Sequence, residues 1–219
     1  MPDPPAGQRA TTHASPRRSY AHAPRLPEAD SYDLRELFAN ATGAAGVDLE
    51  VGCARGGFLL ERLELSPEVY LVGFEIQLKA ATVASQKVAQ RGFSERCRVF
   101  AGDVRSILPK VRPQSVRRVF VHFPDPWWKK RHAKRRLASL ELVQQFERVL
   151  QPDGELFIQT DVEHLAAAFA ESLSLTQTLR PLREQPWLDQ NPYGARSPRE
   201  KQATADGLPI HRLWYRKAP

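Results

Sequence analysis

One carboxylate, two prolines and a preceding apolar run make up the part of this sequence best suited to chemistry. Asp125 lies between Pro124 and Pro126, directly after the apolar run 119–123. Proline cannot continue a strand ladder, so the run predicts a buried strand that ends where Asp125 begins a stiff loop. Ligands of open α/β sheets bind beyond the carboxyl ends of the strands, which makes Asp125 the predicted catalytic residue.

The residues after Asp125 favour a planar, polyanionic partner. Trp127 and Trp128 are followed by a run of cations with no acid among them. Nucleic acid offers bases that can stack and phosphates that attract cations. A basic run is also typical of a solvated helix face or a localisation signal, and loop tryptophans are equally often packing anchors. The cations are Lys129, Lys130, Arg131, Lys134, Arg135 and Arg136.

The overall charge supports an anionic partner. The 219 residues include 32 Lys and Arg against 25 Asp and Glu, which gives a net charge of +7 at pH 7. The six cations from Lys129 to Arg136 nearly equal that whole excess. Charge concentrated in this way gives affinity for polyanions that falls as salt rises. A hydrophobic content of 42% is ordinary for a globular protein of this length.

Cysteine usage and hydropathy argue against several classes of protein. Cys53 and Cys97 are the only cysteines and have no CxxC spacing, so we expect no metal site and no disulfide framework. No basic segment precedes an apolar stretch near the beginning, and no apolar run has spanning length. We therefore expect a cytoplasmic protein without membrane segments. A monomer and a homodimer both remain open.

The chain is predicted to consist of an arm and one domain. Residues 1–30 hold six of the 18 prolines and show no apolar periodicity, which predicts a flexible arm. Ordering on an RNA partner and terminal disorder without a role are both consistent with this composition. Residues 31–219 are predicted to form a single α/β domain.

The first half of the domain has the pattern of a Rossmann-like sheet. An apolar strand at 47–51 leads into a turn with Gly52, Gly56 and Gly57 and then an apolar helix start. Glycines in such a turn let a ligand approach the backbone, so Gly52 is a predicted cofactor contact. The next strand ends in Glu75, where such folds place the acid that binds ribose hydroxyls, although the neighbour of a helix N-cap would look similar.

More strands are predicted to end in acids at the same edge of the sheet. Strands at 97–103 and 155–161 end in Asp103 and Asp161. Carboxylates gathered at one edge repel each other unless a ligand supplies donors, as an adenosine group and an aminoacyl cation would. The sequence also predicts helices at 77–91, 137–150 and 162–173, a stop at 151–154, a strand near 210–215 and a substrate-binding loop at 197–201.

Taken together, these motifs resemble the bacterial tRNA (guanine-N7)-methyltransferase family. The segments that carry the resemblance are LEVGCARGG at 49–57, GFE at 73–75, GDV at 102–104, FPDPWWKKRHAKRR at 123–136, QTD at 159–161 and SPREK at 197–201. The resemblance covers about residues 32–217. It implies a Rossmann-like class I methyltransferase fold, with a seven-stranded, mostly parallel sheet and helices on both faces. It also implies methyl transfer from S-adenosylmethionine to N7 of the variable-loop guanine in tRNA.

The resemblance further implies roles for individual residues. Two motifs depart from the family pattern: Ala54 stands where glycine is usual in the glycine-rich turn, and in the late motif Pro198 and Arg199 stand where a basic and an aromatic residue are usual. The implied cofactor contacts are Glu50, Gly52, Glu75, Asp103 and Asp125. The implied contacts to tRNA or guanine are Lys129, Arg131, Lys134, Arg135, Arg136, Asp161, Ser197, Arg199 and Glu200.

Three other functions share parts of this pattern. A glycine-rich turn followed by Glu75 also fits an NAD-dependent dehydrogenase, in which Asp125 and the cation run would have no place. A nucleic-acid-binding protein could keep the fold as a scaffold without catalysis, and Ala54 leaves this open. A methyltransferase could act on DNA, protein or a small molecule, of which the cation density disfavours the last two.

Overall fold

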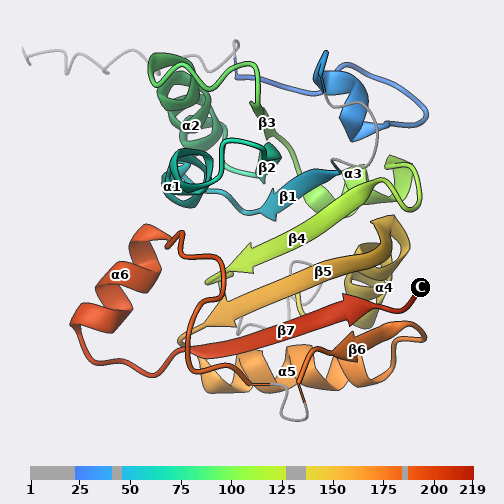
Figure 1. The fold of residues 1–219 in the computed structure, drawn as a ribbon, viewed down its shortest axis with the longest axis vertical. Helices are drawn as coiled ribbons and strands as arrows, with labels where there is room; N and C mark the ends of the chain where they lie inside the picture. The colour runs from blue at the N-terminus through green and yellow to red at the C-terminus, as the bar shows by residue number, and fades with distance from the viewer. Residues whose placement is uncertain (1–22, 41–45, 127–136, 184–186) are drawn as a thin grey trace, which may run out of the picture.

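Seven strands form one sheet in the order β3-β2-β1-β4-β5-β7-β6 (Figure 1). The computed structural model describes residues 23–40, 46–126, 137–183 and 187–219. Neighbouring strands from β1 to β5 pair in parallel, whereas β7 pairs antiparallel with β5 and β6. The predicted seven-stranded, mostly parallel sheet is therefore confirmed. The strands are β1 (Val47–Val51), β2 (Tyr70–Glu75), β3 (Cys97–Ala101), β4 (Val116–His122), β5 (Leu150–Thr160), β6 (Leu179–Pro181) and β7 (His211–Lys217).

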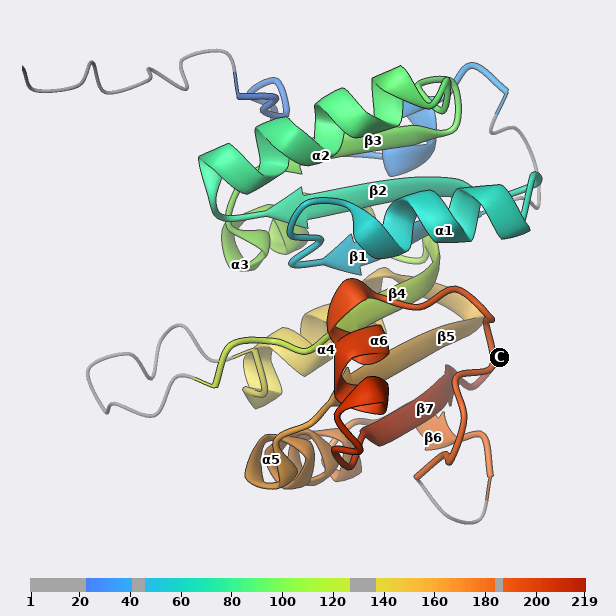
Figure 2. The ribbon, with the colours of Figure 1, turned by 90° about the vertical axis from the view of Figure 1, so that its left-hand side faces the viewer.

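Helices cover both faces of this sheet, as predicted (Figure 2). Successive side chains of a strand point to opposite faces, and β4 shows the result: Val119 and Val121 join one core cluster, while Phe120 joins another. The first cluster includes side chains of α4 and α5, and the second includes Phe58 of α1. The helices are α1 (Gly57–Leu65), α2 (Leu78–Gln90), α3 (Val104–Ile107), α4 (Leu140–Val149), α5 (Glu163–Ser174) and α6 (Pro198–Ala205), with short 3-10 turns η1 (Leu34–Leu37) and η2 (Leu108–Lys110).

Capping side chains set several boundaries that the sequence placed differently. The strand predicted at 97–103 ends earlier, at Ala101, because Asp103 is the N-cap of α3. The Asp103 side chain accepts a hydrogen bond from the Arg105 backbone N–H at 3.0 Å. Ser139 caps α4 by accepting from the Leu142 backbone N–H, so this helix begins three residues later than predicted. In the described ranges no helix combines the length and apolarity needed to cross a membrane.

The substrate-binding loop predicted at 197–201 is instead the start of a helix, α6. Ser197 is its N-cap, and the Ser197 hydroxyl accepts a hydrogen bond from the Glu200 backbone N–H at 3.1 Å. Pro198 occupies the first turn, where its missing N–H costs nothing. The spacing of serine and glutamate by three residues is a capping pattern that the loop prediction overlooked.

The described end of the predicted arm lies against the domain. Ala23 is buried in the cluster formed by α1, α2 and the neighbouring strands. The Pro24 carbonyl accepts a hydrogen bond from the Ala101 backbone N–H, and the Ala29 carbonyl accepts one from Lys110 Nζ at 3.0 Å. Residues 23–30 therefore contact the folded domain, while residues 1–22 lie outside the described part of the chain.

A buried acid near the amino-terminal end of β1 binds arginines from neighbouring elements. Asp48 of β1 is fully buried, and both carboxylate oxygens accept hydrogen bonds from Arg117, at 2.8 and 3.1 Å. The guanidinium groups of Arg62 and Arg118 each lie 3.8 Å from the same carboxylate. The ring of Tyr193 lies against both of these guanidinium groups. Three cations thus compensate one buried charge.

We expect Asp48→Asn to destabilise the fold strongly, because it leaves the guanidinium groups of Arg62 and Arg117 without a carboxylate partner and leaves Arg118 paired with Glu155 alone. Removing one partner of a buried ion pair costs about 3–5 kcal/mol, and partial exposure of the arginines lowers this to roughly 2–4 kcal/mol. Urea unfolding followed by circular dichroism measures the change. Glu64→Gln is the control, because the Glu64–Arg91 pair is exposed and worth at most about 1 kcal/mol. Equal losses in the two variants would contradict this account of Asp48.

Candidate active site

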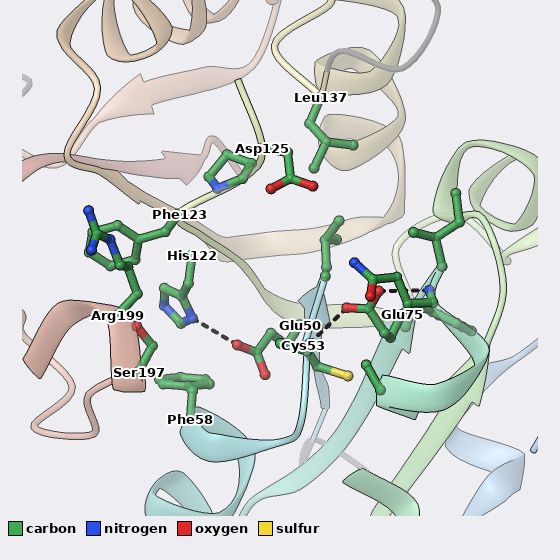
Figure 3. Close-up of a pocket in the computed structure, with 18 of the residues that line it drawn as sticks. Glu50, Cys53, Phe58, Glu75, His122, Phe123, Asp125, Leu137, Ser197 and Arg199 are labelled. Carbon is green, nitrogen blue, oxygen red and sulfur yellow. Dashed lines mark hydrogen bonds and ion pairs between the residues drawn. The ribbon is translucent and has the colours of Figure 1, made fainter. Parts of the chain in front are cut away.

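A cleft of about 1260 Å³ opens at the carboxyl ends of β1 to β5 (Figure 3). Because parallel strands end at the same edge of a sheet, acids that follow different strands meet there. Gly52, Ser197 and Arg199 also line the cleft. The acids that line it are Glu50, Glu75, Asp103, Asp125 and Asp161. The last four follow predicted strand ends, and Glu50 is the cofactor contact that the family resemblance implies.

The glycine-rich turn after β1 presents its backbone to the cleft. Gly52 has φ of +74°, and no atom lies within 4 Å of where a Cβ would be, so a ligand can approach this backbone closely. Ala54 has φ of +47°, a left-handed conformation that costs a residue with a side chain about 1–2 kcal/mol. Alanine thus adopts here a conformation that glycine adopts more easily, and the departure from the family pattern leaves the turn intact.

Glu75 ties this turn to the end of β2. One carboxylate oxygen accepts a hydrogen bond from the Ala54 backbone N–H and the other from the Gln77 backbone N–H, both at 2.8 Å. The side chain is nearly buried, and Figure 3 shows it on the cleft wall. An ionised carboxylate has about four acceptor positions. Each oxygen of Glu75 therefore keeps capacity for a further donor, such as a hydroxyl group of a bound ligand.

Glu50 lies deeper, paired with a residue that the sequence analysis did not identify. Its Oε1 atom lies 2.9 Å from Nδ1 of His122, the last residue of β4 (Figure 3). Burial raises the pKa of Glu50, and the hydrogen bond to His122 opposes part of that rise. Glu50 Oε2 and His122 Nε2 are both buried and have no hydrogen-bond partner among the described residues. A histidine within the otherwise apolar run 119–123 was the available signal.

Asp125 differs from the other acids because it is exposed. β4 ends at His122, and Phe123 adopts φ of +46° while its backbone N–H donates to the Gln159 carbonyl at 2.7 Å. A bulky residue rarely adopts this conformation, which turns the chain into the proline-flanked loop. Asp125 then lies across the cleft from Glu50 and Glu75 (Figure 3).

Two further acids of the cleft already have basic partners. Asp103 accepts hydrogen bonds from the Arg105 side chain in addition to capping α3. Asp161 forms an ion pair with Arg199 of α6, which joins the end of β5 to that helix. Asp161 and Arg199 were both predicted to contact substrate, and the structure brings them together at the cleft.

The predicted substrate contact at Glu200 needs correction. Glu200 is 1% exposed and does not line the cleft. Its carboxylate accepts hydrogen bonds from Gln159 Nε2 at 2.8 Å, Asn191 Nδ2 at 3.0 Å and an Arg212 amine at 3.2 Å. Its own backbone N–H donates to Ser197, which does line the cleft. Glu200 therefore fixes the start of α6, because its backbone N–H binds Ser197 and its carboxylate is hydrogen-bonded inside the protein.

The predicted nucleic-acid contacts that follow the Asp125 loop lie outside the described residues. The same holds for both tryptophans of this stretch. These residues are Trp127, Trp128, Lys129, Arg131, Lys134, Arg135 and Arg136.

The polar groups of the cleft fit a ligand that carries both hydroxyl groups and a cation. Glu75 offers acceptor positions beside an open glycine turn, and Glu50 offers a buried oxygen without a donor. A buried, unpaired carboxylate oxygen is costly, and a cationic donor offsets that cost best. The chemistry of the residues thus matches an adenosine group extended by an aminoacyl ammonium.

Comparison with known sequences agrees with this chemistry. Residues 44–213 match a family model described as "Putative methyltransferase". The chain is 31% identical over 213 residues to the tRNA (guanine-N(7)-)-methyltransferase of Microcystis aeruginosa, which covers 95% of this chain and 97% of that protein. It is 30% identical over 187 residues to the protein of the same name from Rubrobacter xylanophilus, covering 85% of this chain and 81% of that one.

Solved structures share the fold at low sequence identity. TrmN from Thermus thermophilus superposes with a TM-score of 0.57 at 17% identity, covering 79% of this chain and 44% of that chain. Geranyl diphosphate C-methyltransferase from Streptomyces coelicolor A3(2) gives 0.56 at 12% identity, covering 84% and 74%. These likenesses confirm the predicted class I methyltransferase fold. The matches in sequence show that the chain belongs to the tRNA (guanine-N(7)-)-methyltransferase family.

Proposed function

We propose that this protein transfers a methyl group from S-adenosylmethionine to N7 of a guanine in tRNA, and that the target is the variable-loop guanine. The family relationship supports the reaction. The observation that carries it to this chain is the arrangement of Glu50, Glu75 and Asp125 around one cleft. Two buried, unpaired thiols, Cys53 and Cys97, suit a reducing cytoplasm, where the enzyme would meet tRNA.

The cofactor would be held on the β1 and β2 side of the cleft. S-adenosylmethionine supplies a methyl group on a sulfonium, which is open to attack by a lone pair. Glu75 accepts hydrogen bonds from the ribose hydroxyls with the positions that Ala54 and Gln77 leave free. Glu50 faces the aminoacyl ammonium, and Gly52 lets the ligand lie close to the backbone. Asp103 lines the same side of the cleft.

Guanine N7 carries a free lone pair, so no residue has to remove a proton before the methyl group is transferred. The task of the protein is to hold N7 in line with the methyl group, and a well-oriented approach supplies much of the rate. Asp125 accepts hydrogen bonds from the N1–H and N2–H groups of guanine, which orients the base. The base becomes cationic as it is methylated, and the negative charge of Asp125 stabilises that change. Asp161 is a second acceptor in reach of the cleft.

The cation run would bind the tRNA backbone next to this cleft. The run begins directly after the loop that carries Asp125. Phosphate contacts position a nucleic acid without reading its sequence, so they would deliver the target base to Asp125. Arg199 also lines the cleft, and its half-exposed guanidinium, paired with Asp161, could contact a phosphate or a base.

The direct test combines unmodified tRNA transcripts with methyl-labelled S-adenosylmethionine and then cleaves the RNA chemically at N7-methylguanine. We expect one cleavage site, in the variable loop. Labelling at other guanines would contradict the proposed target. An absence of labelling despite binding of cofactor and tRNA would contradict the proposed reaction.

Asp125→Asn should lower turnover by about 100-fold, because a neutral amide no longer stabilises the positive charge that develops on the base. The affinity for tRNA should change by less than about threefold, because phosphate contacts dominate it. Single-turnover kinetics and filter binding measure the two quantities. Asp153→Asn is the matched control: Asp153 is exposed and lies outside the cleft, and asparagine tolerates its φ of +60°. Near-full turnover in Asp125→Asn would show that this carboxylate does not stabilise charge.

The double variant Arg135→Ala with Arg136→Ala should weaken tRNA binding and flatten its salt dependence. Each lost phosphate contact lowers the slope of log affinity against log salt by about 0.7–0.9. Filter binding at several salt concentrations measures the slope. Arg91→Ala should leave it unchanged, because Arg91 pairs with Glu64 outside the cleft. An unchanged slope in the double variant would mean that these cations do not touch phosphate.

Glu50→Gln should make the ligand-free protein more stable and weaken cofactor binding. The folded pKa of Glu50 is raised, so the folded state holds more protons than the unfolded state above the ordinary pKa of the side chain. Stability therefore falls as pH rises through that window. Glutamine removes this loss, so the variant should melt about 2–4 °C higher near pH 7 for each 1 kcal/mol recovered. The gap should close below about pH 3, where the side chain is protonated in both the folded and the unfolded state. A lower melting temperature for the variant at neutral pH would contradict the argument.

A further inference from the structure

The two acids of β1 are compensated in very different ways. Asp48 and Glu50 are two residues apart on one strand, so they point to the same face of the sheet. Asp48 has the guanidinium groups of three arginines around it. Glu50 is buried to the same degree, yet the imidazole of His122 is its one hydrogen-bond partner among the described residues. The carboxylate at the cleft is thus left undercompensated, unlike its neighbour two residues earlier.

Aromatic rings hold the His122 imidazole in a single orientation. The rings of Phe58 and His122 meet in an edge-to-face contact with centroids 4.2 Å apart, and the centroids of Phe120 and Phe157 lie 5.7 and 6.0 Å from that of His122. The His122 side chain is only 3% exposed. A ring packed in this way has little room to turn, so Nδ1 stays directed at Glu50. With Glu50 ionised, Nδ1 carries the proton and donates it to Oε1.

This bond leaves one atom of each residue without a partner. Glu50 Oε2 and His122 Nε2 are both buried and unpaired within the described ranges. A buried acceptor without a donor costs roughly 1–3 kcal/mol, and more when it is charged. Both residues line the cleft, so a ligand there can supply the missing donor to Oε2. Glu75 adds a second negative charge near Glu50, which favours a donor that is positively charged.

We propose that His122 is a positioning residue, which turns the Glu50 carboxylate so that its second oxygen meets the ammonium group of S-adenosylmethionine. This inference rests on the proposed function. His122 itself does not touch the cofactor. It fixes one oxygen of the carboxylate and thereby aims the other, much as a second residue orients a metal-binding histidine. The adenosine end of the cofactor, bound at Glu75, does not depend on this pair.

The test separates the two ends of the cofactor with two ligands. S-adenosylhomocysteine carries the ammonium group, whereas 5′-methylthioadenosine keeps the adenosine and the thioether but lacks the aminoacyl group. Calorimetry measures the dissociation constant of each. His122→Phe keeps an aromatic ring among Phe58, Phe120 and Phe157 but removes the donor. His122→Asn keeps a donor, because its amide nitrogen lies where Nδ1 was.

We expect His122→Phe to weaken S-adenosylhomocysteine by about 10-fold or more, the loss of one charge-assisted hydrogen bond, and 5′-methylthioadenosine by less than about twofold. His122→Asn should restore S-adenosylhomocysteine to within about threefold of the unaltered protein. Equal weakening of both ligands by His122→Phe would show a packing role and overturn the proposal. So would unchanged binding of S-adenosylhomocysteine, or an asparagine variant as weak as the phenylalanine one.

The outcome for the unaltered protein tells this inference apart from the proposed function. If it binds neither ligand, the proposed cofactor is wrong. If it binds both and His122→Phe behaves the same, only the role of His122 is wrong. Thermal melting checks that each variant is folded. If His122→Phe does not fold, His122→Gln gives the same readout, because its amide reaches the Nε2 position and leaves the Nδ1 position without a donor.

Discussion

Burial of the Glu50 carboxylate is the constraint on which the rest of the site depends. The acid lies in β1, an interior strand of the sheet, where removal from water is costly and one imidazole compensates it incompletely. The arginines around Asp48 show that this strand can surround a buried acid with cations. At the cleft the fold leaves that compensation to a ligand. The buried carboxylate lowers the stability of the ligand-free protein. A cationic group that binds there removes this cost, and the free energy recovered contributes to its affinity.

The antiparallel strand β7 brings a remote part of the chain to this cleft. β7 pairs with β5, and Arg212 on β7 donates to the buried carboxylate of Glu200. Glu200 holds Ser197 at the start of α6. The ring of Pro198 lies so close to Gly57 that a side chain there would collide with it. Helix α6 is therefore packed directly on the first turn of α1, next to the glycine-rich turn, so these two walls of the cleft are in contact.

The sequence was sufficient for the sheet and for the acids at its edge, because parallel topology converts a position at the end of a strand into a position at a shared edge. The sequence was not sufficient for contacts that depend on how deeply a side chain is buried. Glu200 has the residue type and motif of a substrate contact, but only packing shows that its side chain is buried on the inner side of α6. His122 reads as one more residue of an apolar strand, and its partner lies 72 positions earlier in the chain. Helix α6 was read as a loop because its polar composition outweighed its capping pattern.

The carboxylates of the cleft differ in their exposure to solvent, and this difference suits them to two different roles. Glu50 and Glu75 are buried and fixed by hydrogen bonds, which suits a ligand that stays through the reaction. Asp125 is exposed on a loop held by two prolines and the unusual backbone of Phe123. An exposed carboxylate remains hydrated between turnovers, so it bears no desolvation cost while no base is bound. The rigid loop keeps it in place, and an entering base replaces water with its own donors at the position where charge will develop.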